Sequence, residues 1–148
     1  MNKARAIALG LAIVLGWEGF SSLPYRDIVG VWTQGYGETA GVTADSPPVT
    51  ERQARATAER RLVRDFATPI DRCLKAPTTD TQYAAYLSLS YNIGVSAFCG
   101  STLVRYHNQG YSFAACAQIK RWNRAGGRVV QGLVNRRADE YATCIKDL

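Results

Sequence analysis

The sequence predicts an α+β protein that is mostly helical and carries one small β-hairpin near its start. Two observations lead to this class. Several segments have apolar side chains at helical spacing or begin with good capping residues, whereas a single short segment is rich in glycine, valine and aromatic residues. The chain has 148 residues, 47% of them hydrophobic, which is enough for one domain with its own core.

The first segment, residues 1–17, has two cations near its start and then no charge from Ala6 to Trp17. This uncharged run is too short for an ordinary transmembrane helix, so we expect a first helix that packs into the core. A signal-like segment is the alternative. A cleaved signal is disfavoured because Glu18 follows directly, and cleavage in the usual place would endanger this candidate catalytic residue.

Residues 18–48 are expected to form a small lobe built on a tight β-hairpin. Glycines stand at positions 30, 35 and 37 among valine and aromatic residues, a pattern typical of a hairpin with close turns. Gly41 and the segment from Asp45 to Pro48 are expected to close the lobe as a loop.

Two carboxylates and a hydroxyl in this region suit glycoside hydrolysis. That reaction needs one carboxyl to protonate the leaving sugar oxygen and a second group to act on the opposite face of the ring. Glu18 follows an apolar run, which favours its protonated form. Asp27 follows Arg26 and precedes a glycine-rich turn, which favours the anion. Thr33 is placed to orient a water against Asp27.

Alone, two carboxylates nine residues apart are weak evidence, because most Asp and Glu side chains are solvated surface charges. A longer match adds specificity. The segment fits the pattern E-G-(x)5-Y-x-D-(x)2-G-(x)2-T-x-G-Y-G, and it resembles the active-site motif of the phage-type lysozymes of glycoside hydrolase family 24, which include the T-even phage lysozymes. The matching residues are Glu18, Gly19, Tyr25, Asp27, Gly30, Thr33, Gly35, Tyr36 and Gly37.

Two positions depart from the family's pattern. Gln34 stands where an isoleucine is common, and Glu38 stands where a histidine is common. Glu38 is a third carboxylate close to the other two in sequence. It either raises the pKa of a neighbouring group or only faces solvent.

After the hairpin lobe, Thr50 and Gln53 form a good capping box for a helix over residues 50–68. An apolar stripe at a spacing of four residues runs along this helix, and Pro69 is expected to end or kink it. Arginines cover its other faces, either as a solvated surface or as a contact for anionic envelope polymers. The resemblance implies that this long helix connects two lobes.

Residues 69–148 are expected to form the second, helical lobe. The uncharged run from Thr81 to Gly94 predicts a buried central helix that ends at Gly94. Ser101 is a good N-cap for a short helix after it. The final helix carries the pattern G-L-(x)2-R-R-(x)2-E, which resembles the last helix of the family. One of its arginines is expected to pair with Glu18 or line the cleft, the alternative being a surface charge.

The resemblance also implies substrate contacts outside the catalytic set. For Asn92, a role in ending the central helix is an equally good interpretation. The residues expected to contact substrate are Tyr36, Tyr91, Asn92, Ser101, Thr102 and Arg136.

The chain has four cysteines and a single histidine, His107. No Cys/His cluster suits a metal, so no metal and no cofactor is expected. The even number of cysteines allows two disulfides in an oxidising compartment, or free thiols in the cytoplasm. If bridges form, we expect Cys73 to pair with Cys144 and Cys99 to pair with Cys116.

The net charge of +6 favours polyanionic partners such as nucleic acid, anionic lipid or the acidic bacterial envelope. The arginines lack a recognisable motif for reading nucleic acid, so nucleic acid is not an expected partner.

The resemblance implies a two-lobed, lysozyme-like fold and an N-acetylmuramidase that hydrolyses β-1,4 bonds between N-acetylmuramic acid and N-acetylglucosamine in peptidoglycan. Glu18 would be the general acid, and Asp27 with Thr33 would activate the attacking water, which fits inversion at the anomeric carbon. A monomeric phage endolysin is implied, made in the host cytoplasm and acting on the wall from the periplasmic side.

Some members of this family keep an uncleaved N-terminal anchor that later leaves the membrane. Residues 1–17 are a candidate for such a signal-anchor-release segment, with transient membrane contact. Two other functions stay open. A lytic transglycosylase would use a single acid/base carboxylate, and the presence of both Asp27 and Thr33 argues against it. A cationic envelope-binding or membrane-active protein without chemistry is compatible with the charge and the N-terminal run.

Overall fold

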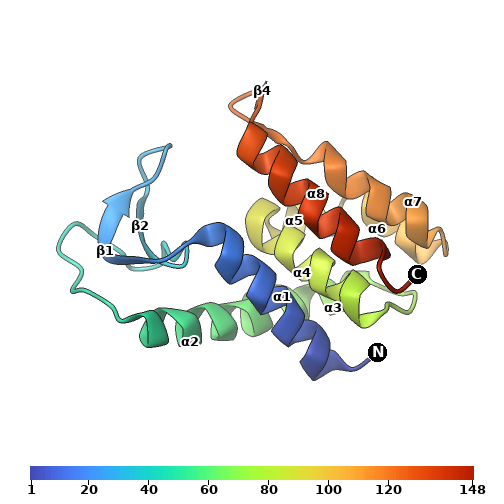
Figure 1. Ribbon diagram of the computed structural model, residues 1–148, viewed down its shortest axis with the longest axis horizontal. Coiled ribbons are helices and arrows are strands. Elements are labelled where there is room, and N and C mark those ends of the chain that lie inside the picture. The colour runs from blue at the N-terminus through green and yellow to red at the C-terminus, as the bar shows by residue number, and fades with distance from the viewer.

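The computed structural model describes residues 1–148 and shows a helical body with a small β-hairpin projecting at one end (Figure 1). Helix α1 (Lys3–Glu18) leads into strands β1 (Ser21–Arg26) and β2 (Trp32–Gly35), which pair antiparallel. From residue 51 onwards the chain is mainly helical, apart from a second, very short hairpin. The predicted class, α+β and mostly helical, is confirmed.

Helix α1 packs closely against helix α4 (Asp80–Ile93). Ala6, Gly10 and Val14 lie on its buried face. A Cβ at Gly10 would come within 3.1 Å of the Leu87 side chain, so the two helices approach this closely because Gly10 has no side chain. No helix of the molecule combines the length and the apolar character needed to cross a bilayer.

Helix α1 ends at Glu18 because Gly19 adopts a φ of +70°, a conformation that suits glycine and turns the chain into the hairpin. Glu18 therefore stands on the last turn of a helix whose other face is packed into the core. This position gives the carboxylate a rigid support.

A long helical segment connects the hairpin to the rest of the body. It consists of α2 (Glu51–Arg61), a π-helical stretch η1 (Leu62–Ala67) and α3 (Thr68–Cys73). Its N-terminus has the predicted capping box, in which Thr50 and Gln53 each bond the other's backbone N–H.

The connecting helix does not end at Pro69, contrary to one of the two expectations for that residue, because α3 continues to Cys73. In η1 the N–H of Thr68 bonds to the carbonyl of Val63, one residue further back than in an α-helix. This wider turn directly precedes Pro69. The wider turn leaves room for the ring of Pro69, and it needs no N–H from that residue.

Helix α4 is the buried centre of the larger lobe, as its uncharged sequence predicts. Every residue from Thr81 to Ser90 is buried. The side chain of Thr79 caps its start, and Gly94, with a φ of +91°, ends it. Helices α1 and α8 (Gln131–Ile145) both pack on it (Figure 1).

The remaining elements complete the helical lobe. They are α5 (Val95–Cys99), α6 (Thr102–Asn108), α7 (Ser112–Gln118), the 3-10 turn η2 (Ile119–Arg121), β3 (Arg124–Ala125) and β4 (Arg128–Val129). Ser101 caps α6 as predicted, since its Oγ accepts the N–H of Val104 over 3.2 Å. The β3–β4 hairpin was not predicted, although its turn contains Gly126 and Gly127.

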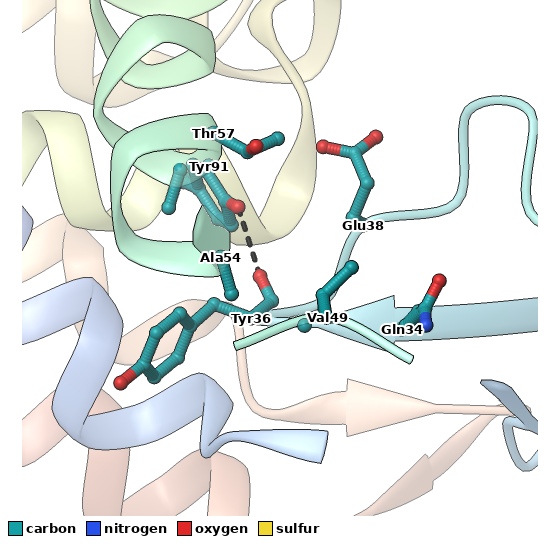
Figure 2. Close-up of a pocket in the computed structure, with 9 residues that line it drawn as sticks. Gln34, Tyr36, Glu38, Val49, Ala54, Thr57 and Tyr91 are labelled. Atoms are coloured by element: carbon teal, nitrogen blue, oxygen red, sulfur yellow. Dashed lines mark hydrogen bonds between the residues drawn. The ribbon is translucent and has the colours of Figure 1, made fainter. Parts of the chain in front are cut away.

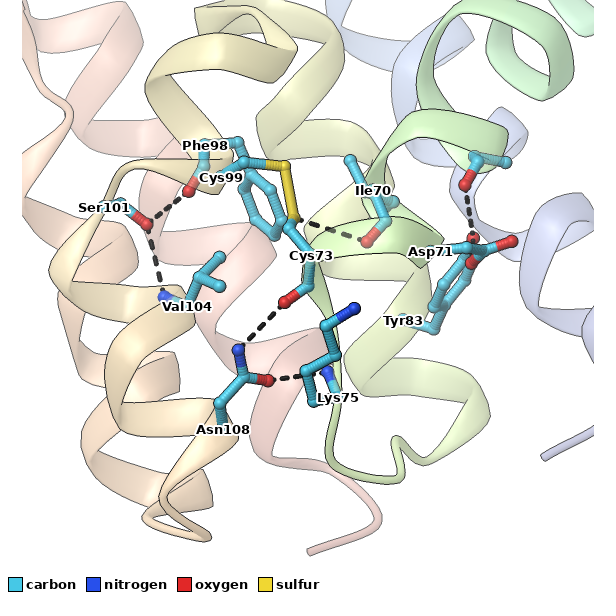
Figure 3. The surroundings of a disulfide bond; sticks show 11 residues. Ile70, Asp71, Cys73, Lys75, Tyr83, Phe98, Cys99, Ser101, Val104 and Asn108 are labelled. Atoms are coloured by element: carbon cyan, nitrogen blue, oxygen red, sulfur yellow. Dashed lines mark hydrogen bonds between the residues drawn. A yellow bond between two sulfur atoms is a disulfide. The ribbon is translucent and has the colours of Figure 1, made fainter.

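The cysteines form two disulfides, Cys73–Cys99 and Cys116–Cys144, with Cα atoms 5.7 and 5.8 Å apart. The expected pairing, Cys73 with Cys144 and Cys99 with Cys116, is wrong. The first bridge joins the ends of α3 and α5 (Figure 3), and the second joins α7 to α8. The pairing follows which helices pack side by side around α4, and the spacing of the cysteines does not reveal that arrangement.

Candidate active site

Two distant parts of the chain position the carboxylate of Glu18. Nη1 of Arg136, on α8, donates to Oε1 over 2.8 Å. On the other side, a Cβ at Gly37 would lie 2.8 Å from Oε2, so the backbone after β2 closely approaches the carboxylate. The side chain of Glu18 is 20% exposed and that of Arg136 only 6%. Glu18 is therefore fixed in place but still accessible from solvent.

Asp27 begins the turn between β1 and β2, and the backbone of this turn fixes its side chain. Oδ1 accepts the N–H of Val29 over 3.0 Å and that of Val31 over 2.8 Å, which leaves Oδ2 available for a water. The carbonyl oxygen of Val31 accepts both the N–H of Asp27 and the hydroxyl of Thr33, each over 2.9 Å. Asp27 and the buried Thr33 therefore meet at one backbone carbonyl.

A cavity of about 820 Å³ lies between the sequence neighbours of these carboxylates and the helical lobe. Trp17, which precedes Glu18, lines it, and so does Ile28, which follows Asp27. The opposite wall comes from the end of α4, the β3–β4 hairpin and the start of α8, the elements to the right of the β1–β2 hairpin in Figure 1. Asn92, Trp122, Arg124 and Arg136 are among the residues of that wall. This cavity is the candidate substrate cleft.

Behind Glu18 lies a buried network of charges. Glu140 is fully buried, and its Oε1 accepts from Nε of Arg136 over 3.2 Å, from Nη2 of Arg137 over 3.0 Å and from Oγ of Ser88 over 2.6 Å. Burial lowers the pKa of Arg137 and raises the pKa of Glu140, while their mutual attraction opposes both shifts. Nη1 of Arg137 also donates to Oδ1 of Asn92 over 2.9 Å. The network therefore reaches the wall of the cleft.

Tyr36 and Tyr91 lie at the junction of the two lobes and do not line the main cavity. The hydroxyl of Tyr91 donates to the carbonyl of Tyr36 over 3.0 Å (Figure 2) and accepts from Nη1 of Arg61 over 2.8 Å. Burial raises the pKa of Tyr91 to about 12. The ring of Tyr36 points toward α1, and its hydroxyl donates to Glu51 over 3.0 Å. A small cavity of about 50 Å³ lies between the two tyrosines and helix α2.

Glu38 belongs to the same junction. Its Oε2 lies 3.2 Å from Nε of Arg61 on α2, and its side chain is 18% exposed. Glu38 is therefore not a solvent-facing carboxylate. Through Arg61 and Tyr91 it links the end of the hairpin lobe to both α2 and α4.

Ser101 and Thr102 line a neighbouring cavity of about 310 Å³. Arg121 and Trp122 line both this cavity and the main one, so they stand between the two. A substrate in the main cavity would reach these hydroxyls only where it extends past Trp122.

Several residues of the cleft were not predicted to contact substrate, among them Trp17, Ile28 and Arg124. Ile28 is 94% exposed, so an apolar side chain stands open at the tip of the hairpin. The position of Trp17 next to Glu18 was a usable signal, whereas Arg124 belongs to the hairpin that was not predicted. No group of three or more His, Cys, Asp and Glu side chains is arranged to hold a metal ion.

Residues 15–140 match the family model described as phage lysozyme. The SAR-endolysin of Enterobacteria phage P21 is 38% identical over 158 aligned positions, which cover 98% of this chain and 95% of that protein. Among solved structures, the endolysin from Escherichia coli O157:H7 phage FAHEc1 has a TM-score of 0.84 at 28% identity, covering 95% of this chain and 92% of that one. The muramidase domain of SpmX from Asticaccaulis excentricus has a TM-score of 0.82 at 26% identity, covering 92% and 94%.

Proposed function

The chain belongs to the phage lysozyme family, and on this premise we propose that it is a phage endolysin of glycoside hydrolase family 24. It is a lysozyme-type glycosidase, and its substrate is the β-1,4 bond between N-acetylmuramic acid and N-acetylglucosamine in host peptidoglycan. The observation that supports this best is that Arg136, which lines the cleft, fixes Glu18, while Ile28, the neighbour of Asp27, lines the cleft from the hairpin. The enzyme causes lysis by cutting the glycan strands of the wall.

Glu18 acts as the general acid. Its Oε1 is occupied by Arg136, so Oε2 carries the proton that passes to the leaving sugar oxygen. Bound sugar covers the exposed part of the side chain, so water is excluded from the acid before the bond breaks.

Asp27 acts as the base that activates water. Its Oδ1 is fixed by two backbone N–H groups, which stabilise the anion, and Oδ2 receives the proton from the attacking water. Thr33 lies at the same carbonyl of Val31 and orients this water. An attack from the face opposite to Glu18 inverts the configuration at the anomeric carbon.

The glycan strand occupies the main cavity. Trp17 and Trp122 offer aromatic surface, and Asn92 and Arg136 offer polar groups, a combination typical of ligand sites. Sugar units or attached groups that extend past Trp122 reach Ser101 and Thr102. The protein works as a monomer.

The enzyme acts on the wall from the periplasmic side, and residues 1–17 serve as a signal-anchor-release segment on the way. The similarity to a SAR-endolysin and the uncharged run from Ala6 to Trp17 support this. In fractionated cells, we expect the protein first in the membrane fraction and later in the periplasm. Peptide mapping of the periplasmic protein should still detect the N-terminal peptide that contains Met1. A chain confined to the cytoplasm until lysis would contradict this route.

The decisive experiment digests purified peptidoglycan with the wild type and with Glu18→Gln, and weighs the products by mass spectrometry. Glu18→Gln keeps the shape of the side chain but cannot donate the proton, so turnover should fall by roughly three orders of magnitude or more. Thr33→Ala should lower turnover less than Asp27→Asn does, because the carboxylate of Asp27 remains as the base.

Three outcomes separate the candidate functions. Reducing muramic ends from the wild type alone establish a hydrolytic muramidase that depends on Glu18. Anhydro-muramic ends would mean a lytic transglycosylase and would leave Asp27 without a water to activate. Bacterial killing that survives Glu18→Gln, without any cleavage, would mean an envelope-binding or membrane-active protein.

A further inference from the structure

Glu140 is a fully buried carboxylate that does not touch the cleft. It lies on α8 with 0% of its side chain exposed. Two guanidinium groups and one hydroxyl surround it, from Arg136 and Arg137 on the same helix and from Ser88 on α4. An isolated carboxylate at such a depth is costly, so its presence between two arginines requires an explanation.

Each arginine that Glu140 contacts has a second contact at the active site. Arg136 reaches from Glu140 to Oε1 of Glu18, over 2.8 Å. Arg137 reaches from Glu140 to Oδ1 of Asn92, over 2.9 Å, and to the carbonyl of Trp122, over 3.3 Å. One buried carboxylate therefore connects the candidate acid with two residues that line the opposite wall of the cleft.

The geometry explains why a carboxylate is needed at this position. Nε of Arg136 and Nη2 of Arg137 both donate to Oε1 of Glu140, over 3.2 and 3.0 Å, so the carboxylate holds each guanidinium by one nitrogen. Nη1 of each arginine is then directed at Glu18 or Asn92. Without the carboxylate, the two like charges would repel each other at a largely buried site, and neither Nη1 group would have a fixed direction.

We propose that Glu140 is a positioning residue for the reaction: it aligns Arg136 on the catalytic acid and Arg137 on Asn92. This inference rests on the proposed muramidase activity. Glu140 touches neither the substrate nor the reacting atoms, and it acts through the two arginines.

The proposal also makes a statement about charge. Glu18, Arg136, Arg137 and Glu140 together are electrically neutral when all four are ionised, and Ser88, which faces Glu140 from α4, carries no charge. Removing the charge of Glu140 leaves two cations for one anion, Glu18. The excess positive charge favours ionised Glu18, so the alkaline limb of the activity profile moves to lower pH.

The test compares Glu140→Gln and Glu140→Asp with the wild type in kcat, KM and the pH dependence of kcat, using purified peptidoglycan and soluble glycan strands. For Glu140→Gln we expect kcat to fall about tenfold or more with a much smaller change in KM. The alkaline limb of its activity profile should move to lower pH. Glu140→Asp keeps the charge, so it should keep the limb near its wild-type position while still losing kcat.

Removing a buried partner of two arginines can unfold the protein, so a milder matched pair accompanies these variants. Ser88→Ala and Tyr86→Phe each remove one buried hydroxyl from α4. The hydroxyl of Ser88 bonds Glu140, whereas that of Tyr86 faces Gln82 and His107. Both variants should lose similar thermal stability, but only Ser88→Ala should lower kcat.

The outcomes distinguish the inference from the proposed function. A wild type that releases no reducing muramic ends removes the proposed function itself. A wild type that does release them, together with Glu140→Gln or Ser88→Ala variants that keep kcat and the pH profile, overturns the role of Glu140. Equal losses of kcat in Ser88→Ala and Tyr86→Phe would reduce that role to general stability and also overturn it.

Discussion

Nη1 of Arg136 donates to Oε1 of Glu18 over 2.8 Å, although 118 positions separate the two residues in the sequence. Because Arg136 is almost fully buried, this contact ties the end of α1 to the last helix of the chain. The candidate acid is thus in place only when the first and last helices are both docked on α4. Activity should therefore respond to changes far from the cleft.

Arg136→Lys should lower kcat by about tenfold to a hundredfold while KM changes much less, because a single ammonium nitrogen does not reproduce the rigid pair of donors, Nη1 to Glu18 and Nε to Glu140. Steady-state kinetics on purified peptidoglycan measures this. Arg64→Lys is the control, since Arg64 is exposed and pairs with Asp65 away from the cleft. A normal kcat in Arg136→Lys would mean that the ion pair is not used in the reaction.

Gly37→Ala should lose activity while the protein stays folded, because the new Cβ would stand 2.8 Å from Oε2 of Glu18 and displace the carboxylate. Gly41→Ala provides a matched control. Both glycines have positive φ, +77° and +70°, so both variants carry a backbone strain of about 1 kcal/mol, but nothing lies within 4 Å of a Cβ at Gly41. If the two variants lose activity equally, strain explains the loss and contact with Glu18 does not.

Replacing either cysteine pair by serine should lower the free energy of unfolding by about 3 to 4 kcal/mol, because the bridges close loops of similar length. Urea unfolding measures this effect. On warming, the variant without Cys116–Cys144 should lose activity at a lower temperature than the variant without Cys73–Cys99. The reason is that Cys144 anchors α8, the helix that carries Arg136. Peptide mapping without reductant provides the control, and a cross-linked peptide joining Cys73 to Cys144 would contradict the pairing.

Acid should weaken the fold through His107, the single histidine. The residue is 1% exposed, its ring lies between Tyr86 and the carbonyl of Ala76, and burial lowers its pKa below the ordinary 6.5. The unfolded chain therefore binds this proton more readily than the folded one. The contribution of His107 to stability is complete above about pH 6.5 and declines as the pH falls below it.

Chemical unfolding at about pH 7.5 and pH 5 tests the role of His107. Its replacement by glutamine, which can still donate and accept hydrogen bonds, should make the stability less sensitive to acid over this interval. If His107→Gln shows the same loss of stability as the wild type, other groups are responsible.

The hairpin side of the site was predictable because its information is local. Glu18, Asp27 and Thr33 lie in one short segment, and the glycines between them indicate the turn that brings Asp27 and Thr33 to the carbonyl of Val31. The central helix was predictable for a similar reason, since a helix whose side chains are apolar or small on nearly every face is buried.

The rest depends on contacts that cross the chain. The disulfide pairing follows the packing order of the helices around α4, and the π-turn before Pro69 was hidden because proline usually ends a helix. Glu38 was expected either to raise the pKa of a neighbouring group or to face solvent. Its ion-pair partner, Arg61, could not be predicted because it lies on another element. In the sequence, Glu140 is only the final residue of the pattern G-L-(x)2-R-R-(x)2-E. Its proposed role depends on Arg136 and Arg137, which contact Glu18 and Asn92 respectively.

The bridge between Cys73 and Cys99 closes a covalent ring that includes the loop from α3 to α4, in which Lys75 and Pro77 are exposed (Figure 3). A protease that nicks this loop at Lys75 would leave two fragments that stay covalently joined, with Glu18 on the first and Arg136 on the second. The nicked molecule would keep both halves of its active site in an oxidising, protease-rich surrounding such as a lysing bacterial envelope. After reduction, only non-covalent contacts such as the packing of α1 on α4 would hold the fragments together, and the activity would depend on them.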